Sequence, residues 1–332
     1  MSMANGRSGI LLVDKPQGIT SHDVVSRTRK RAGTKKVGHA GTLDPMATGL
    51  LVLGINHSTR LLTYLVGLDK EYFATIRLGS ATNTDDAEGK TTMTAADGTI
   101  AALESDAVEI VLETLRGSIS QVPSSVSAIK VDGKRAYTLA RAGEVVELAA
   151  RAVSVRALEV LAVRDSTDVN GRHIRDLDVR IECTSGTYVR AIARDLGIAL
   201  GVGGHLTALR RTKIGPFSVL DAAELETLDV AAALISPAII ATELFDVYSL
   251  TETETVDLGN GKRITVDGSR IIREAREGPI AAVSPDGRLV GLFEVVGGNA
   301  KPIVNFAPDL LASEPASIPT ETSAPVSPWT SE

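Results

Sequence analysis

The segment from Gly38 to Pro45 constrains the chain more than any other, because it holds one carboxylate, Asp44, between a glycine-rich stretch and a proline. Pro45 disfavours the α region at Asp44, and Gly38 and Gly41 allow the preceding backbone to turn tightly or to approach a ligand closely. These residues predict a loop whose backbone fixes the direction of the Asp44 side chain. Gly, Asp and Pro are also common in ordinary turns, so a turn without any function explains the same residues.

Length and composition restrict the class of protein. The 332 residues are enough for one large domain and a small one with a substantial core. No apolar run is long enough to span a membrane, and the start from Met1 to Arg7 lacks the apolar stretch of a signal peptide. The single cysteine, Cys183, excludes an internal disulfide and a multi-thiolate metal site. We therefore expect a cytoplasmic protein that is not bound to a membrane.

The formal net charge of -6 argues at first against a nucleic-acid partner, because phosphate binding uses Lys and Arg. The distribution of charge answers this objection. Basic residues cluster from Arg27 to Lys36, just before Asp44, and again from Lys130 to Arg141, whereas acids gather from Asp85 to Glu113 and in the tail. A basic face on an acidic protein is compatible with RNA, although a solvated surface also explains each basic run.

Apolar periodicity predicts strands and helices in one mixed domain. Ser21 is expected to cap the first helix, and Gly201 to end the last one. Strands are expected at Ile10 to Val13, Leu50 to Leu53, Glu71 to Leu78 and Leu177 to Cys183. The last of these strands is expected to be half-buried, with Cys183 in the core. Helices are expected after Ser21, at Thr59 to Val66, after Ser105 and at Tyr188 to Leu200.

The pattern changes towards the C-terminus. From Val247 to about Phe306, short apolar runs alternate with turns, and Ser284 to Gly287 separates two such runs in the manner of a hairpin. This predicts a small β-rich module. The segment from Ala312 to Glu332 is rich in Ser, Thr and Pro and has no basic residue, so we expect a disordered tail.

Several segments, in this order, resemble the bacterial tRNA pseudouridine synthases of the TruB type. Besides Gly38 to Pro45 they are Gly9 to Ser21, Met46 to Leu53, Asp69 to Tyr72, Val122 to Lys130, Gly133 with Tyr137, Gly186 to Arg190 and Leu209 to Arg211. The resemblance covers about Gly9 to Asp221. It implies an α+β fold, with a mixed-sheet pseudouridine synthase catalytic domain and a small β-rich PUA-like RNA-binding domain. The expected boundaries are a disordered N-terminus at 1–8, the catalytic domain at 9–238 with a mobile RNA-clamping insertion at 124–146, the PUA-like domain at 239–309 and the tail at 310–332.

The resemblance implies that the chain isomerises the T-loop uridine at position 55 of tRNA to pseudouridine. This reaction breaks the bond from N1 to C1′ and rejoins the uracil through C5, so it needs no redox cofactor. It does need an ionised carboxylate beside a base removed from its stack. The resemblance assigns that role to Asp44, and both covalent attack and abstraction of a sugar proton remain open.

The resemblance also implies further site residues. Tyr72 would lie against the uracil, and we rank it as a stacking platform before a base, because an unperturbed phenol has a pKa of about 10. An exposed arginine in the first turn of a helix opposes the helix dipole, so Arg190 suggests a function beside Asp44. The implied substrate-binding residues are His39, Tyr72, Tyr188, Arg190 and Leu209, and the implied RNA-backbone contacts are Lys15, Lys70, Lys130, Lys134, Arg135, Arg141, Arg210 and Arg211.

The expected partner is the T-arm of tRNA, bound by a monomer with no obligate protein partner, no cofactor and no metal. Two departures from the family pattern stand out. Asn56 to Arg60 replaces a Gly-x-Ala-Thr-Lys segment, and Ser185 replaces a lysine of some relatives. The first departure leaves the local loop shape and a phosphate contact open.

Two other functions compete with this interpretation. A tRNA-binding or folding chaperone without catalysis would use the same basic surface, but binding alone gains nothing from a buried acid near phosphates. An aspartate-nucleophile hydrolase fits less well, because the chain lacks the metal ligands that such phosphate chemistry usually recruits.

Overall fold

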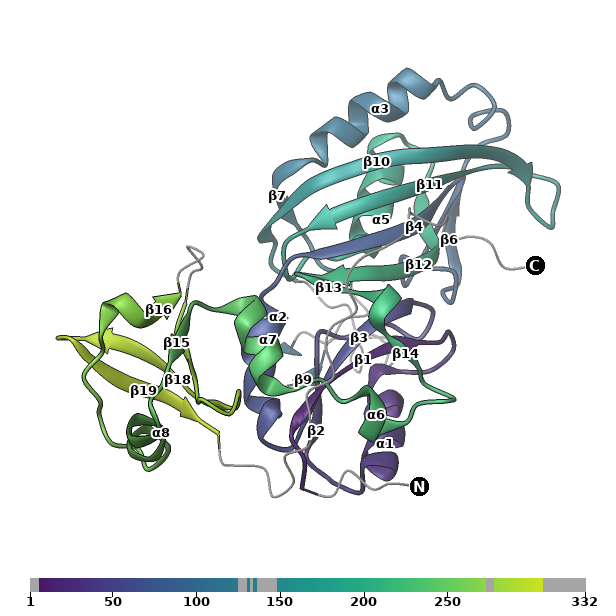
Figure 1. Ribbon diagram of the computed structural model, residues 1–332. Helices are drawn as coiled ribbons and strands as arrows, with labels where there is room; N and C mark the ends of the chain where they lie inside the picture. Colours follow the sequence, from purple (N-terminus) through teal and green to yellow (C-terminus); the bar gives the residue numbers. More distant parts are fainter. Residues whose placement is uncertain (1–5, 125–129, 132–133, 136–147, 273–277, 307–332) are drawn as a thin grey trace. The chain divides into compact units, whose positions relative to one another are not determined.

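The computed structural model describes residues 6–124, 130–131, 134–135, 148–272 and 278–306 (Figure 1). The chain divides into two compact units. Among the described residues, the first contains 6–44, 50–66 and those from 216 to 306, and the second contains 45–49 and those from 67 to 215. The expected tail at 310–332 and most of the expected insertion at 124–146 lie outside the described residues, and the division at residue 238 stays a prediction.

The first unit contains the predicted strands around Ile10 and Leu50, which are hydrogen-bonded neighbours in a sheet. Strand β1 (Gly9–Lys15) pairs in parallel with β14 (Ala223–Glu224), and β2 (Val37–Ala40) pairs antiparallel with β3 (Thr48–Ile55). Helix α1 (Ser21–Ala32) contributes buried apolar side chains to the same core. Apolar runs therefore located β1 and β3 correctly.

The start of α1 lies one residue earlier than the sequence suggested. The N-cap is Thr20, whose hydroxyl accepts from the Asp23 amide while the Asp23 carboxylate accepts from the Thr20 amide. Such a reciprocal pair satisfies two backbone donors at the end of a helix. The expectation that Ser21 caps the helix is wrong, and its hydroxyl has another partner. The predicted helix at Thr59 begins as a 3-10 turn, η1 (Asn56–Leu61), before α2 (Leu62–Val66).

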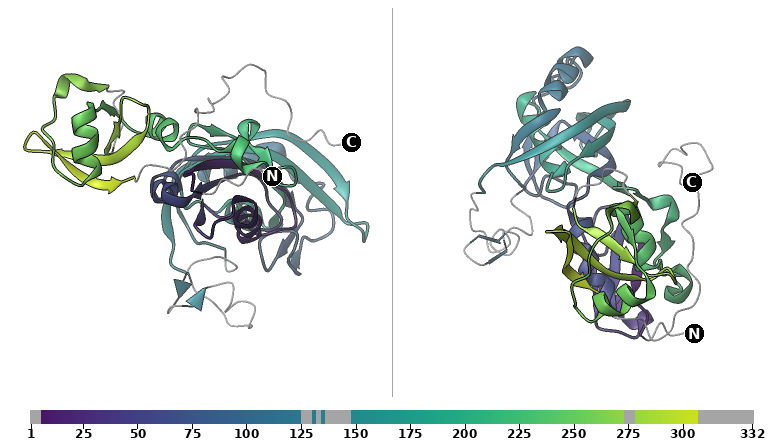
Figure 2. Two further views of the ribbon diagram at one scale, coloured as in Figure 1. Left: turned by 60° about the horizontal axis from the view of Figure 1, so that its bottom comes forward. Right: turned by 60° about the vertical axis from the view of Figure 1, so that its left-hand side comes forward.

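The first unit also holds a five-stranded sheet, in the order β16 (Ile271–Ile272), β15 (Val247–Ser249), β17 (Ile280–Val283), β18 (Leu289–Val296) and β19 (Asn299–Asn305). Its light green and yellow strands can be followed in both views of Figure 2. The predicted hairpin joins β17 to β18. Helix α8 (Glu252–Gly259) was not predicted; Thr251 and Glu254 form a capping box at its start. The other elements of this unit are β13 (Phe217–Ser218), η2 (Val219–Asp221), α6 (Val230–Ala233), α7 (Pro237–Leu244) and η3 (Gly268–Arg270).

The second unit is built on an antiparallel sheet in the order β12 (Gly204–Ile214), β4 (Lys70–Leu78), β11 (His173–Cys183), β10 (Arg151–Thr167) and β7 (Gly117–Gln121). The first residues of β3, Thr48 and Gly49, pair in parallel with β12. Figure 1 shows α5 (Val189–Ala199) and α3 (Ser105–Thr114) beside this sheet. Short hairpins add β5 (Ser80–Thr82) with β6 (Thr91–Thr94), and β8 (Lys130–Val131) with β9 (Lys134–Arg135).

The polar face of this sheet is more buried than strand periodicity predicted. Asp176 and Asp178 of β11 are only 8% and 5% exposed. Arg77 forms an ion pair of 2.7 Å with Asp176, and the Thr75 hydroxyl donates to Asp178 over 2.8 Å. Cross-strand pairing of opposite charges thus replaces the solvent expected on this face. Cys183 lies in the core as predicted, and burial raises the pKa of its thiol to about 11.

Candidate active site

Asp44 lies in the loop between β2 and β3, and Ser21 holds this loop at the residue before Asp44. Leu43 and Met46 are buried at 3% and 4% exposure, whereas Asp44 itself is half-buried. The Ser21 hydroxyl accepts from the Leu43 amide over 2.8 Å and donates to the Leu43 carbonyl over 3.0 Å. A side chain that brackets both backbone groups of Leu43 fixes the direction in which the next residue leaves the chain. Ser21, expected from the sequence to cap a helix, therefore positions the candidate catalytic aspartate.

Two other predicted residues lie in the first unit. His39 lies on β2 opposite Leu53 and is half-buried. The ammonium group of Lys15 is fully buried, and it donates to the carbonyls of Pro16 and Ile19 over 3.0 and 2.8 Å. Lys15 thus closes its own loop in the free protein, and its contact with an RNA phosphate stays a prediction.

All three arginines of the basic run before Asp44 bond within the first unit. Arg27 forms an ion pair of 2.7 Å with Glu226, and Arg31 donates to the Glu226 carbonyl over 2.9 Å. Arg29 donates to the Val37 carbonyl over 3.0 Å. These arginine side chains hold α1 to neighbouring segments, whereas the lysines of the run are exposed to solvent.

In the second unit, Tyr72 and Leu209 share one face of the sheet. Tyr72 on β4 pairs with Arg211 on β12, and Leu209 pairs with Ala74. Because cross-strand partners and alternate residues point to the same side, both side chains face the same way. Each is 8% exposed. The arrangement brings together two of the residues expected to line the uracil pocket.

Tyr188 and Arg190 begin helix α5, where Tyr188 is the N-cap. The Gln121 side chain brackets Tyr188, because its oxygen accepts from the Tyr188 amide over 2.8 Å and its nitrogen donates to the Tyr188 carbonyl over 3.1 Å. Gln121 is 2% exposed and ends β7. The helix start is therefore fixed by a residue that no sequence motif singled out.

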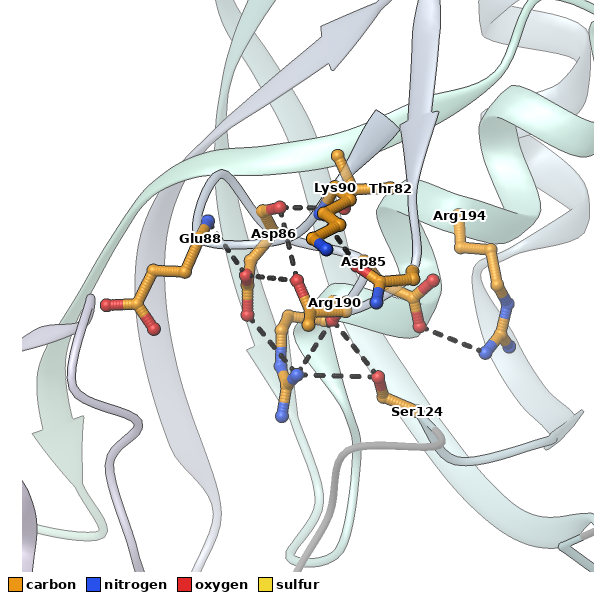
Figure 3. Close-up of polar contacts among 10 residues, drawn as sticks. Thr82, Asp85, Asp86, Glu88, Lys90, Ser124, Arg190 and Arg194 are labelled. Carbon is orange, nitrogen blue, oxygen red and sulfur yellow. Dashed lines mark hydrogen bonds and ion pairs between the residues drawn. The ribbon is translucent and has the colours of Figure 1, made fainter. Parts of the chain in front are cut away.

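Arg190 is 5% exposed, so it is not a solvated arginine of a first helical turn. Figure 3 shows its guanidinium among groups of the loop that follows β5. It donates to the Thr84 carbonyl over 2.8 Å, and it lies 3.3 Å from an Asp86 carboxylate oxygen and 3.4 Å from the Ser124 hydroxyl. Several partners on one guanidinium keep a buried charge satisfied and oriented.

The sequence places Asp86 in an acidic segment typical of a solvated surface, yet Asp86 is 3% exposed. Its carboxylate also accepts from the Thr84 hydroxyl over 2.6 Å and from the Glu88 amide over 3.1 Å. The available signal was an acid in a turn rich in Asn, Thr and Gly, where such side chains bond to nearby backbone. Asp44 belongs to the first unit and Arg190 to the second, and their pairing stays a prediction.

The predicted phosphate contacts differ in exposure. Lys70 and Arg211 are 7% and 1% exposed. Burial, with Arg211 nearby, lowers the pKa of Lys70 to about 8, and its ammonium donates to the Leu68 carbonyl over 2.5 Å. Arg210 lies 3.3 Å from the Thr48 hydroxyl. Lys130, Lys134 and Arg135 belong to the β8–β9 hairpin, and Arg141 lies outside the described residues.

The departure from the family pattern at Asn56 has a structural explanation. Asn56 has a φ of 53°, in the left-handed region that favours glycine and that Asn tolerates better than most residues. Its side chain accepts from the Thr34 hydroxyl over 2.8 Å and donates to the Arg7 carbonyl over 2.7 Å. Arg60, which replaces the family lysine, donates to the Asn305 carbonyl over 2.5 Å. The loop therefore keeps a glycine-like backbone.

Asn56→Ala is expected to destabilise the protein more than Asn56→Gly. Both variants lose the two side-chain hydrogen bonds, but only Ala also strains the left-handed backbone, which adds about 1 kcal/mol or more. The free energy of unfolding, measured by denaturant titration, tests this order. A glycine variant less stable than the alanine variant would contradict it.

Over the residues that the structure describes, no group of three His, Cys, Asp or Glu side chains is arranged to hold a metal ion. In the same ranges, no helix is both long and apolar enough to cross a bilayer.

The chain matches three family models in succession. Residues 29–189 match the N-terminal domain of the TruB family pseudouridylate synthases, 190–247 the C-terminal domain of tRNA pseudouridylate synthase B, and 245–307 the C-terminal region of tRNA pseudouridine synthase II. A chain in a crystal structure of a Cbf5–Nop10–Gar1 complex has a TM-score of 0.64 and 25% identity, covering 91% of this chain and 85% of that one. The predicted α+β fold with a small β-rich C-terminal domain is confirmed.

Curated relatives cover nearly the whole chain. The tRNA pseudouridine synthase B of Leifsonia xyli is 55% identical over 305 residues, which are 92% of this chain and 98% of that protein. The corresponding protein of Corynebacterium diphtheriae is 46% identical over 94% of this chain and its own full length. The chain therefore belongs to the TruB family of tRNA pseudouridine synthases, which are isomerases.

Proposed function

We propose that the chain converts the uridine at position 55 in the T-loop of tRNA to pseudouridine, with Asp44 as the reacting carboxylate and the base turned out of its stack. The observation that carries this proposal is the 55% identity over 98% of a relative named tRNA pseudouridine synthase B. The hydrogen bonds by which Ser21 holds Leu43, next to Asp44, support the choice of Asp44 as the reacting residue.

The reaction is an isomerisation, in which the bond from N1 to C1′ breaks, C5 bonds to C1′, and a proton leaves C5 while N1 gains one. A carboxylate can attack covalently or remove a sugar proton, and neither route needs an electron donor. The base must leave its stack, because a paired and stacked nucleotide cannot be reached. A loop fixed by Ser21 on one side lowers the entropic cost of aligning Asp44 with the extruded nucleotide.

Groups of the second unit suit the other tasks of the site. The guanidinium of Arg190, held by Asp86 and Thr84, supplies an oriented positive charge that favours ionised carboxylates in its vicinity. Tyr72 and Leu209 present a ring and an apolar side chain on one sheet face, and these fit the stacking of an extruded uracil. His39 and Tyr188 are assigned to the RNA contact and to the pocket wall on resemblance.

The test uses an unmodified tRNA transcript without any added cofactor, followed by mapping of pseudouridine. We expect one pseudouridine, at position 55, and none in a transcript with cytidine there. A protein that speeds tRNA folding but forms no pseudouridine would instead be a folding chaperone.

The dependence of affinity on salt separates RNA binding from chemistry. Each neutralised phosphate contact contributes about 0.7 to 0.9 to the slope of log affinity against log salt. We expect the Lys130→Gln, Arg141→Gln double variant to weaken binding and to flatten the slope by about one to two units, whereas Tyr72→Ala leaves the slope unchanged and impairs turnover. Filter binding at several salt concentrations measures both. A Tyr72 variant that changes the slope as much as the basic pair would show that the RNA surface is misassigned.

A further inference from the structure

A second arginine of α5 reaches the same loop as Arg190. Arg194 lies one helical turn later, so both side chains leave the same face of the helix (Figure 3). Its guanidinium lies 3.3 Å from an Asp85 carboxylate oxygen and donates to the Val122 carbonyl over 2.7 Å. The side chains of Arg194 and Asp85 are 20% and 11% exposed. Arg194 therefore joins the loop and the end of the β7 segment to the helix that carries Arg190.

The backbone at Asp85 is shaped for this contact. Neighbouring residues in an extended chain point to opposite sides, yet Asp85 and Asp86 each meet one arginine of α5. Asp85 has a φ of 59°, a left-handed conformation that Asp and Asn adopt more readily than most other residues with a side chain. Its carbonyl accepts from the Leu206 amide over 3.0 Å, which ties the turn to β12. Left-handed residues held by several contacts are often found at functional sites.

The hydrogen bond from Arg194 to the Val122 carbonyl holds the segment that carries Ser124, a neighbour of Arg190. Val122 lies two residues before Ser124, whose side chain is fully buried. The Ser124 hydroxyl donates to the Thr84 carbonyl over 3.2 Å and lies 3.4 Å from the Arg190 guanidinium. Asp85 and Val122, both held by Arg194, are thus adjacent or nearly adjacent in sequence to the groups that contact Arg190.

We infer that Asp85 and Arg194 form a positioning pair, which fixes Thr84, Asp86 and Ser124 around Arg190 and so sets the direction of its guanidinium during isomerisation. The inference rests on the proposed function of Arg190. We assign the pair a role through the groups around Arg190 and not through contact with the reacting atoms, so its effect should appear in the chemical step. Arg190 keeps its charge when the pair is broken, but the groups that orient it can shift.

The test measures single-turnover pseudouridine formation and tRNA affinity for Arg194→Met, Asp85→Asn and the double variant. Methionine keeps an apolar stem but removes the charge and the donor to Val122. We expect each single variant to lower the rate about tenfold, since small misplacements of a catalytic group have large effects, while affinity changes less than twofold. Because the two residues act as a unit, the double variant should be no slower than the slower single variant.

Two further variants distinguish positioning from general stability. Arg164→Met breaks an ion pair with Asp178 on the sheet of the same unit, and it should lower the unfolding midpoint without changing the rate. Arg194→Lys keeps the charge but cannot hold Asp85 and Val122 together, so its rate should be intermediate, and it serves if the methionine variant does not fold. Wild-type rates in the Arg194 variants, additive effects in the double variant, or an equal rate loss in Arg164→Met would overturn the inference. A wild-type protein inactive on tRNA would instead contradict the proposed function.

Discussion

Asp44→Asn is expected to abolish pseudouridine formation while tRNA affinity stays within a few-fold of the wild type. The amide can neither attack as a carboxylate nor accept a proton as one, so a loss of several orders of magnitude in the single-turnover rate follows for either route. The backbone bracket from Ser21 to Leu43 does not involve the Asp44 side chain, so the loop should persist in the variant.

The experiment compares single-turnover rates and binding of an unmodified T-arm hairpin. Asp106→Asn, an exposed residue in the first turn of α3, removes the same charge elsewhere and should react at the wild-type rate. Mass spectrometry of the Asn variant excludes deamidation back to Asp. Substantial turnover by an intact Asn variant would show that Asp44 is not the reacting group.

Gly49→Ala is expected to cause a large loss of stability, although it adds only one methyl group. Gly49 has a φ of 103°, and an added Cβ would lie 2.2 Å from the Arg211 carbonyl oxygen and 2.8 Å from its nitrogen. Backbone atoms cannot swing aside as a flexible side chain can. Strain at positive φ and the overlap with β12 together should lower the free energy of unfolding by about 3 kcal/mol or more.

Gly98→Ala is the matched control for this variant. Gly98 also has a positive φ, of 80°, but an added Cβ would meet nothing within 4 Å. It should therefore lose only the strain contribution, about 1 to 2 kcal/mol. Denaturant titration of both variants separates strain from overlap. Equal losses in the two would mean that β3 can move away from β12 at little cost.

Local patterns in the sequence determined much of this protein. Apolar runs located β1, β3 and β4, and the apolar periodicity after Ser105 located α3. The period of a strand or helix depends on neighbours within a few residues, so the sequence contains this information directly. The motif around Asp44 likewise indicated the family, because its residues are adjacent in the chain.

The partners of the site residues lie far from them along the chain, so no local pattern of the sequence predicts these contacts. Arg190 meets Asp86 across 104 residues, and Arg60 meets Asn305 across 245. An acid pair such as Asp85 and Asp86 has the same local signature on a solvated surface as in a buried turn, and only packing against α5 separates the two cases.

Ser21 illustrates the same limit. A serine before a helix is a good cap, and here Thr20 takes that role while Ser21 holds Leu43. The sequence by itself determined several of the main elements, the family and the candidate aspartate, because these depend on local spacing and on adjacent residues. Tertiary structure alone decided which polar groups are buried and which partners satisfy them, because a buried charge takes whichever partner the fold brings within hydrogen-bonding distance.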